Sequence, residues 1–277
     1  MLSGPFGSVP DALTYVVLLL LAFALWRAIW RGRNLPGVPR GRTLLVGHRG
    51  TRGVEPENTL AAFARAFDDG LDGVEFDVQR SLDGELVLTH DEEVGGRPVA
   101  GQSYGQLRER LPELATLDEL FALARRYPGR LLNLEIKASG WRTRGLERAI
   151  VRAVNASGLA DRVLVSSFNP LSLLRVRLLA PRLRVALLYD ASTAKLRGGR
   201  PLPGWLHVDA LHPHHSLVDE PFVREAHGRA LAVNVWTVNE PDAMRALRAM
   251  GVDAIMGDDP SELRSSTAGG QEPWNPS

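Results

Sequence analysis

Charged residues stand at the ends of three apolar, strand-like runs, where a globular fold usually places apolar ones. The runs read VGHRG from residue 46, VEFDV from residue 74 and LEIK from residue 134. Burying an unpaired charge is so unfavourable that a chain keeps such groups only if they neutralise one another, bind a metal or face water. This layout is typical of an active site.

Two carboxylates in this pattern share one side of a strand. Glu75 and Asp77 are two residues apart, so their side chains point the same way from an extended chain. If Glu135 joins them from a neighbouring strand, three oxygen donors converge, and the chain has no cysteine that could add a thiolate. Such a set favours Mg²⁺ or Ca²⁺, with Mn²⁺ possible, over zinc. The alternative is ion pairing with arginine at the rim of a barrel.

Two histidines and two cations accompany the carboxylates. His48 and His90 are the candidate acid and base, because imidazole exchanges protons near neutral pH. Arg49 and Lys137 could neutralise an anionic phosphoryl group. Lysine occurs only at 137 and 195 among many arginines, which indicates that position 137 requires a compact ammonium.

Two polar residues that precede a predicted helix have simpler interpretations. Asn58 is expected to be its N-cap. Glu57 is either a partner of Arg49 or a first-turn acid favoured by the helix dipole, and the sequence leaves both open.

Eight strand-like runs alternate with helical patterns after residue 42. The predicted strands cover 44–46, 73–77, 131–136, 163–166, 184–188, 210–212, 232–236 and 254–256. The predicted helices include 58–69, 116–126, 141–157, 170–179, 219–228 and 239–250. This alternation predicts an α/β fold, a single (β/α)8 TIM barrel with its site at the carboxyl ends of the strands. A doubly wound open sheet is the alternative, but neither GxGxxG nor GxxxxGK[ST] is present.

Bulk composition narrows the classes of protein. A chain of 277 residues with 44% hydrophobic content suits one large domain. The net charge of +1 and the lack of a basic stripe argue against nucleic acid as a partner. Residues 91–116 break the alternation and are expected to form an excursion over the barrel mouth.

The segment 12–30 is almost entirely apolar and predicts one transmembrane helix, about 28 Å long. Trp26 and Trp30 would lie in the aromatic belt. A cleaved signal peptide is the alternative, but residues 1–10 carry no positive charge. Arginines follow the span, so the positive-inside rule places the catalytic body in the cytoplasm at the cell membrane. The predicted division is a tip (1–11), an anchor (12–30), a linker (31–42), a barrel (43–264) and a disordered tail (265–277).

The order and spacing of seven motifs resemble the glycerophosphodiester phosphodiesterase family over residues 43–264. The motifs are HRG at 48, PENT at 56, EFDV at 75, HD at 90, LEIK at 134, SSF at 166 and VWTVN at 235. The resemblance implies a metal-dependent TIM-barrel hydrolase that cleaves glycerophosphodiesters to glycerol 3-phosphate and an alcohol. It implies these roles: metal ligands Glu75, Asp77 and Glu135; acid and base His48 and His90; phosphate contacts Arg49 and Lys137; and pocket wall Trp236.

One loop departs from the family pattern. After His90 and Asp91 the family usually continues with a Leu-x-Arg-Thr-Thr-like stretch, whereas this chain has EEVGGR at 92–97. The leaving alcohol is therefore left open. The alternatives are a lysophospholipase D acting on membrane lysophospholipids, a lyase that stops at a cyclic phosphate, and a membrane-tethered barrel that binds lipid head groups without turnover.

Overall fold

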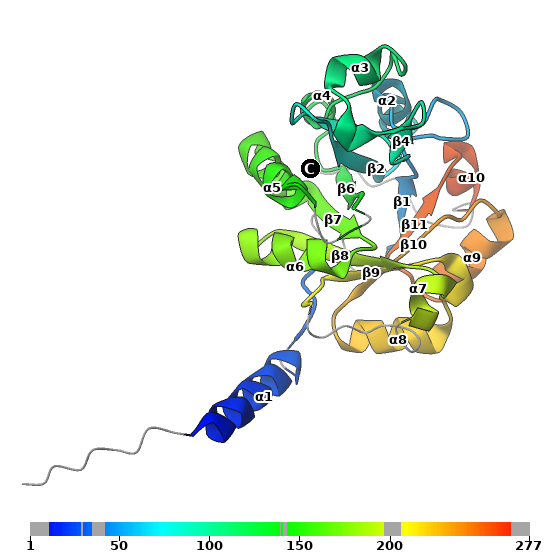
Figure 1. Cartoon of the computed structure of the whole chain (residues 1–277). Coiled ribbons are helices and arrows are strands. Elements are labelled where there is room, and N and C mark those ends of the chain that lie inside the picture. The colour runs from blue at the N-terminus through cyan, green and yellow to red at the C-terminus, as the bar shows by residue number, and fades with distance from the viewer. Residues whose placement is uncertain are drawn as a thin grey trace, which may run out of the picture.

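Eight parallel strands close into a barrel in the computed structural model, which describes residues 11–28, 30–34, 42–138, 140, 143–196 and 206–266 (Figure 1). The strands are β1 (Leu44–Gly47), β2 (Gly73–Arg80), β6 (Leu131–Ile136), β7 (Val163–Ser167), β8 (Arg184–Tyr189), β9 (Ala210–Pro213), β10 (Ala232–Val235) and β11 (Ala254–Gly257). They neighbour one another in chain order, and β1 pairs with both β11 and β2, which closes the ring. The predicted barrel is confirmed, and the open sheet is wrong.

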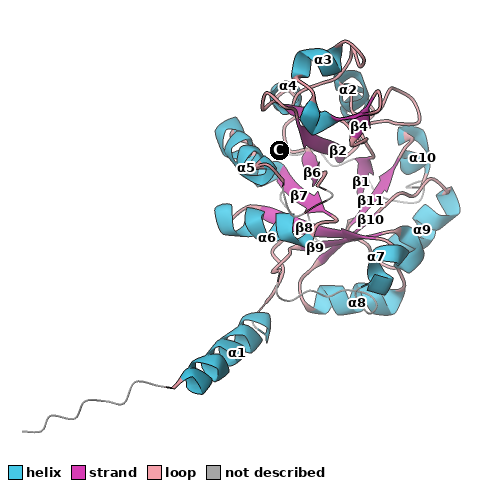
Figure 2. Cartoon of the chain, viewed as in Figure 1, coloured by secondary structure: helices cyan, strands magenta, loops and turns pink. Residues whose placement is uncertain are grey.

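A helix follows each barrel strand and covers its outer side (Figure 2). The helices are α2 (Leu60–Asp68), α4 (Leu117–Ala124), α5 (Leu146–Ser157), α6 (Pro170–Leu179), α7 (Ala191–Leu196), α8 (Glu220–Gly228), α9 (Pro241–Ala249) and α10 (Pro260–Ser265). Short α7 and α10 lie outside the predicted set. Their few residues give too little apolar periodicity for a sequence pattern to register.

Two apolar layers hold the barrel together. Phe63, Phe76 and Phe121 belong to the larger layer, between strands and helices, and all three are fully buried. The smaller layer fills the barrel interior and is made of Leu44, Val46, Leu131, Leu164, Ala186, Ala210, Ala232, Ala254 and Met256. The interior is thus packed, as small barrels require, and buried polar pairs such as Asn133 with Ser166 and Asn234 with His212 lie two residues further along the same strands.

The excursion predicted at 91–116 interrupts the alternation between β2 and α4. Strand β3 (Leu86–Leu88) first pairs antiparallel with the end of β2. A small hairpin of β4 (Glu93–Val94) and β5 (Arg97–Pro98), the turn η1 (Val99–Gly101) and helix α3 (Tyr104–Arg108) then follow. The segment has its own apolar cluster, made of Val87, Val94, Val99, Leu107 and Leu114. Residues of this segment share a pocket with Lys137, so it borders the end of β6.

The structure does not support the predicted transmembrane anchor. Helix α1 (Ala12–Ala28) has 17 residues and extends away from the barrel (Figure 1). At about 1.5 Å per residue it is shorter than a bilayer core of about 30 Å. Trp30, expected in the aromatic belt, is 2% exposed and donates its indole N–H to the carbonyl of Val208 at 3.0 Å. Within the described part of the chain, no helix combines the length and apolarity that a membrane crossing needs.

The start of the predicted linker is docked on the barrel. The Arg31 side chain donates to the carbonyl of Gly228, and Arg33 Nε lies 2.7 Å from Asp209 Oδ1. These bonds hold Arg31 and Arg33 against the barrel, although composition alone predicted that they belong to a linker. Residues 1–10, 35–41 and 267–277 lie outside the described residues, so the predicted tip, the rest of the linker and most of the tail stay predictions, as does the cellular compartment.

Candidate active site

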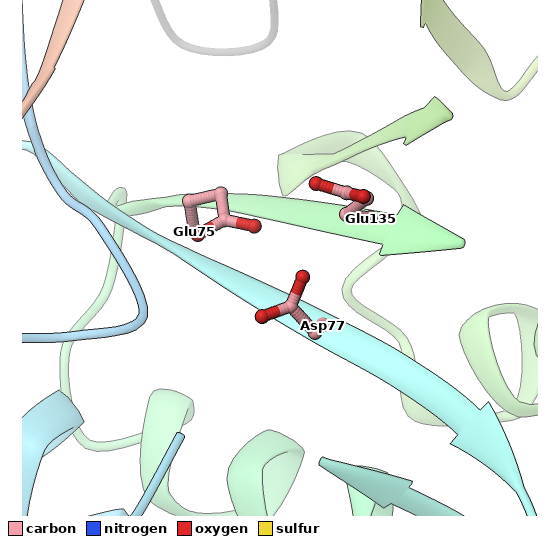
Figure 3. Close-up of side chains that lie close together, drawn as sticks. All are labelled: Glu75, Asp77 and Glu135. Atoms are coloured by element: carbon pink, nitrogen blue, oxygen red, sulfur yellow. The ribbon is translucent and has the colours of Figure 1, made fainter. Parts of the chain in front are cut away.

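Three buried carboxylates converge at the carboxyl end of two neighbouring strands. Glu75 and Asp77 project from β2 and Glu135 from β6, where Asp77 and Glu135 are register partners. Figure 3 shows the three side chains facing one space, and one oxygen of each lies within 4.8 Å of the others. Their exposed fractions are 3%, 1% and 8%. The i, i+2 spacing on one strand and the parallel register of the next produce this convergence.

Two cations contact the carboxylates without balancing them. Lys137 Nζ lies 2.8 Å from Glu135 Oε1 and 3.2 Å from Asp77 Oδ1. Arg49 Nε lies 3.4 Å from Asp77 Oδ2, and the Arg49 backbone N–H donates to Glu75 Oε2 at 3.0 Å. Arg49 also pairs with Glu57 at 2.8 Å, which settles the role of Glu57 as its partner. Negative charge is therefore in excess here.

The pKa values of the carboxylates report this excess. Burial, followed by repulsion from Asp77 and Glu135, raises the pKa of Glu75 well above its usual value. Burial and then Asp77 raise the pKa of Glu135 to about 7. Burial alone would also raise the pKa of Asp77, but Lys137 and Arg49 outweigh it and lower that pKa. A set of hard oxygen donors short of positive charge fits a divalent cation such as Mg²⁺ or Ca²⁺.

Asn58 holds one of these carboxylates and is not the helix cap expected from the sequence. Its Nδ2 donates to Asp77 Oδ2 at 2.9 Å, and its Oδ1 accepts the Asp77 backbone N–H at 3.1 Å. The cap of α2 is Thr59, whose hydroxyl accepts the N–H of Ala62. Asn58 has φ +58°, a left-handed conformation that asparagine tolerates better than most residues. The helix starts two residues later than predicted for this reason.

A tight turn after β1 presents His48 and Arg49. Gly50 has φ +87°, and a Cβ there would collide with Ala62 of α2. Arg49 itself has φ +50°, so the turn holds a strained conformation at the site. The turn directs the Arg49 N–H to Glu75, as described, and brings His48 Nδ1 to 2.7 Å from Asp258 Oδ1.

Sequence reasoning missed Asp258, which directly follows β11. The sequence did contain a signal for Asp258, because a carboxylate that follows the last predicted strand should lie at the same end of the barrel as His48. Both side chains are largely buried, with 18% and 11% exposed.

Gln79 is the second residue that the sequence analysis missed. It continues the i, i+2 series of Glu75 and Asp77 along β2 and is 7% exposed. Its Nε2 donates to the carbonyls of Thr89 at 3.0 Å and Asp91 at 2.7 Å. These hydrogen bonds hold the loop that carries His90 in place. The His90 side chain is 34% exposed.

Three of the predicted site residues, His90, Glu135 and Lys137, line one open pocket of about 650 Å³ together with Phe168. Asp91, Glu92 and Glu93 form its acidic rim. Trp236 lies beside this wall, with its ring 5.5 Å from that of Phe168 in an edge-to-face arrangement. Its indole N–H donates to the carbonyl of His212 at 2.8 Å, which fixes the ring.

Comparisons with known proteins agree with this geometry. A protein of Caldanaerobacter subterraneus named glycerophosphodiester phosphodiesterase is 32% identical over 241 residues, which cover 80% of this chain and 96% of that protein. A crystal structure of a glycerophosphodiester phosphodiesterase from Parabacteroides distasonis superposes with a TM-score of 0.70 at 26% identity, covering 82% of this chain and 97% of the other. An Oleispira antarctica phosphodiesterase in complex with the product sn-glycerol-3-phosphate gives 0.66 at 26% identity, covering 83% and 97%.

The sequence model of one family matches nearly the whole barrel. The match runs over residues 48–262, from the first candidate histidine to the last helix, and so includes every candidate site residue. By this match and these relatives, the chain belongs to the glycerophosphoryl diester phosphodiesterase family.

Proposed function

We propose that this enzyme hydrolyses glycerophosphodiesters to glycerol 3-phosphate and an alcohol with the help of one divalent cation. Glu75, Asp77 and Glu135 would hold the cation, and the convergence of these buried carboxylates beside two basic side chains is the observation that carries the proposal. When bound, the cation would neutralise charge that builds up on the phosphoryl oxygens. The product complex of the Oleispira antarctica relative supports this choice of product.

Arg49 and Lys137 would bind the phosphate. Lys137 has two carboxylate partners, Glu135 and Asp77, and an ammonium group has three hydrogens. The third hydrogen suits a phosphoryl oxygen at the pocket that Lys137 lines. Both cations keep their charge, since neighbouring carboxylates outweigh burial and raise the pKa of each.

His48 and His90 would move the protons. One imidazole takes the proton from the glycerol hydroxyl of the substrate as its oxygen attacks phosphorus. The other gives a proton to the leaving alcohol, and water then opens the cyclic phosphate. Each transfer of this kind contributes about 10²-fold or more to the rate.

A lysophospholipase D activity is a second candidate, and a neighbouring pocket favours it. This pocket measures about 380 Å³ and borders Lys137. Its lining combines the apolar side chains of Leu82, Pro98, Ala100 and Leu146 with polar ones, Arg80 and Arg144 among them. Such a lining could accept the start of an acyl chain, which a glycerol head group does not need.

An assay of the purified protein distinguishes these functions. Glycerophosphocholine, glycerophosphoethanolamine and a lysophospholipid would each be supplied with Mg²⁺, Ca²⁺ or Mn²⁺, and free glycerol 3-phosphate would be measured. We expect release that a chelator abolishes and added cation restores. Replacing His48 or His90 with glutamine should lower kcat about 10²-fold. Full activity after chelation would refute the metal role, and binding of all three substrates without any product would favour a head-group binder.

A further inference from the structure

We propose that Asp258 is the positioning residue that orients His48 and fixes the tautomer of its ring. The inference rests on the proposed function, in which His48 moves a proton. Its basis is the 2.7 Å contact between His48 Nδ1 and Asp258 Oδ1, formed between the ends of β1 and β11.

The chemistry of the contact determines which ring nitrogen is protonated. An ionised carboxylate can only accept hydrogen bonds, so the neutral imidazole must carry its hydrogen on Nδ1. Nε2 then keeps its lone pair and can take a proton from a substrate hydroxyl. Asp258 is held in the ionised form, because hydrogen bonds from His48 and Asn239 outweigh burial and lower its pKa.

Asp258 is itself held in place on several sides. Asn239, after β10, donates its Nδ2 to Asp258 Oδ2 at 2.8 Å and accepts the Asp258 backbone N–H on its Oδ1 at 3.0 Å. The backbone N–H of Gly53 donates to the Asp258 carbonyl at 3.0 Å. The His48 N–H donates to the carbonyl of Gly257 at 2.9 Å, which fixes the histidine relative to the carboxylate. A side chain locked in this way can impose a geometry on its neighbour.

Among the residues that the structure describes, His90 has no equally fixed partner. Its Nδ1 lies 3.0 Å from Asp91 Oδ1, but the Asp91 side chain is 80% exposed, against 18% for Asp258. An exposed carboxylate is free to change rotamer and is screened by water. The two histidines thus differ in preorganisation, and His48 is the one with a set tautomer.

The substitution Asp258→Asn tests the role with little change of shape. The amide can donate to Nδ1 and favour the tautomer with hydrogen on Nε2, so we expect kcat to fall about 10²-fold or more. KM should stay near its wild-type value, since Asp258 reaches His48 and not the pocket. Asp259→Asn is the matched control, because Asp259 caps α10 through Ser261 and asparagine caps equally well. It should leave kcat unchanged.

Nitrogen NMR of histidine-labelled protein provides a readout that does not depend on turnover. The His48 signals, assigned by their loss in His48→Gln, should show a protonated Nδ1 in the neutral ring of the wild type and a changed pattern in Asp258→Asn. A wild-type ring protonated on Nε2 overturns the proposal, as does an active wild type with full kcat in Asp258→Asn. If no glycerophosphodiester is hydrolysed but the Nδ1 tautomer is observed, the proposed function fails and the positioning role stands.

Discussion

Both ends of the barrel bury carboxylates, but only one end leaves them short of positive charge. At the amino end, Asp72, Asp209 and Asp253 each directly precede a strand, β2, β9 and β11 respectively. Each accepts the backbone N–H of the second residue of a neighbouring strand, namely Leu45, Val185 and Val233. These aspartates complete the sheet where its hydrogen bonding begins.

The charge balance differs between the two ends. Asp209 pairs with Arg33 and with Arg177, each at 2.7 Å, and these cations outweigh burial and lower its pKa. At the carboxyl end, burial and mutual repulsion raise the pKa values of Glu75 and Glu135. Balanced carboxylates stabilise the fold, whereas unbalanced ones are kept at some cost in stability and are available to a ligand.

Glu75→Gln should have the largest effect on activity, since Glu75 is a metal-ligand candidate whose pKa is raised in the fold. It removes one anionic ligand while leaving an amide of the same shape, so we expect kcat/KM to fall about 10³-fold, together with the affinity for Mg²⁺. Activity over a Mg²⁺ titration and calorimetric Mg²⁺ binding would measure both. The thermal midpoint should not fall, and a variant with normal activity but a lower midpoint would contradict the comparison of the two ends.

Asp209→Asn should have the opposite profile. It leaves Arg33 and Arg177 without their carboxylate, and breaking a buried ion pair from one side costs about 3 kcal/mol of unfolding free energy. Urea denaturation would measure the loss. The fraction that stays folded should hydrolyse substrate at the wild-type kcat, so a loss of kcat at full folding would show that the amino end also serves catalysis.

Gln79→Leu should have a moderate effect on kcat. It removes the amide that holds the carbonyls of Thr89 and Asp91, so His90 loses part of its alignment. We expect kcat to fall about 10-fold, because small misplacements of a reacting group are costly. Gln106→Leu is a control on another glutamine, which serves in the capping box of α3. Equal kcat values for both variants would remove Gln79 from the site.

The sequence predicted what depends on local pattern. The alternation of strands and helices predicted the barrel, and the charges at strand ends predicted that Glu75, Asp77 and Glu135 converge. The sequence could not predict contacts that arise only when the barrel closes. Asp258 meets His48 across 210 positions of sequence, and Trp30 donates to Val208 because residues 30–33 contact the barrel near the start of β9. An apolar composition alone could not distinguish that packing from a lipid interface.

The two ends should also differ in their response to pH, with the smallest expected effect. The pKa of Glu135 is about 7 in the metal-free fold, against a usual value of 4.5, so the folded state binds an extra proton between these values. Stability therefore increases as the pH falls from about 7 to about 4.5. Asp209 has a lowered pKa, so its contribution to stability is present above its unfolded pKa of about 3.9 and is lost only below that value.

The metal-free protein should thus melt about 3 °C higher at pH 5.5 than at pH 8. Saturating Mg²⁺ should reverse the order by stabilising the pH 8 sample, and Glu135→Gln should flatten the metal-free difference. Scanning calorimetry at both pH values measures this, and a metal-free pH difference that is the same in the wild type and in Glu135→Gln would mean that the site is already balanced without a cation.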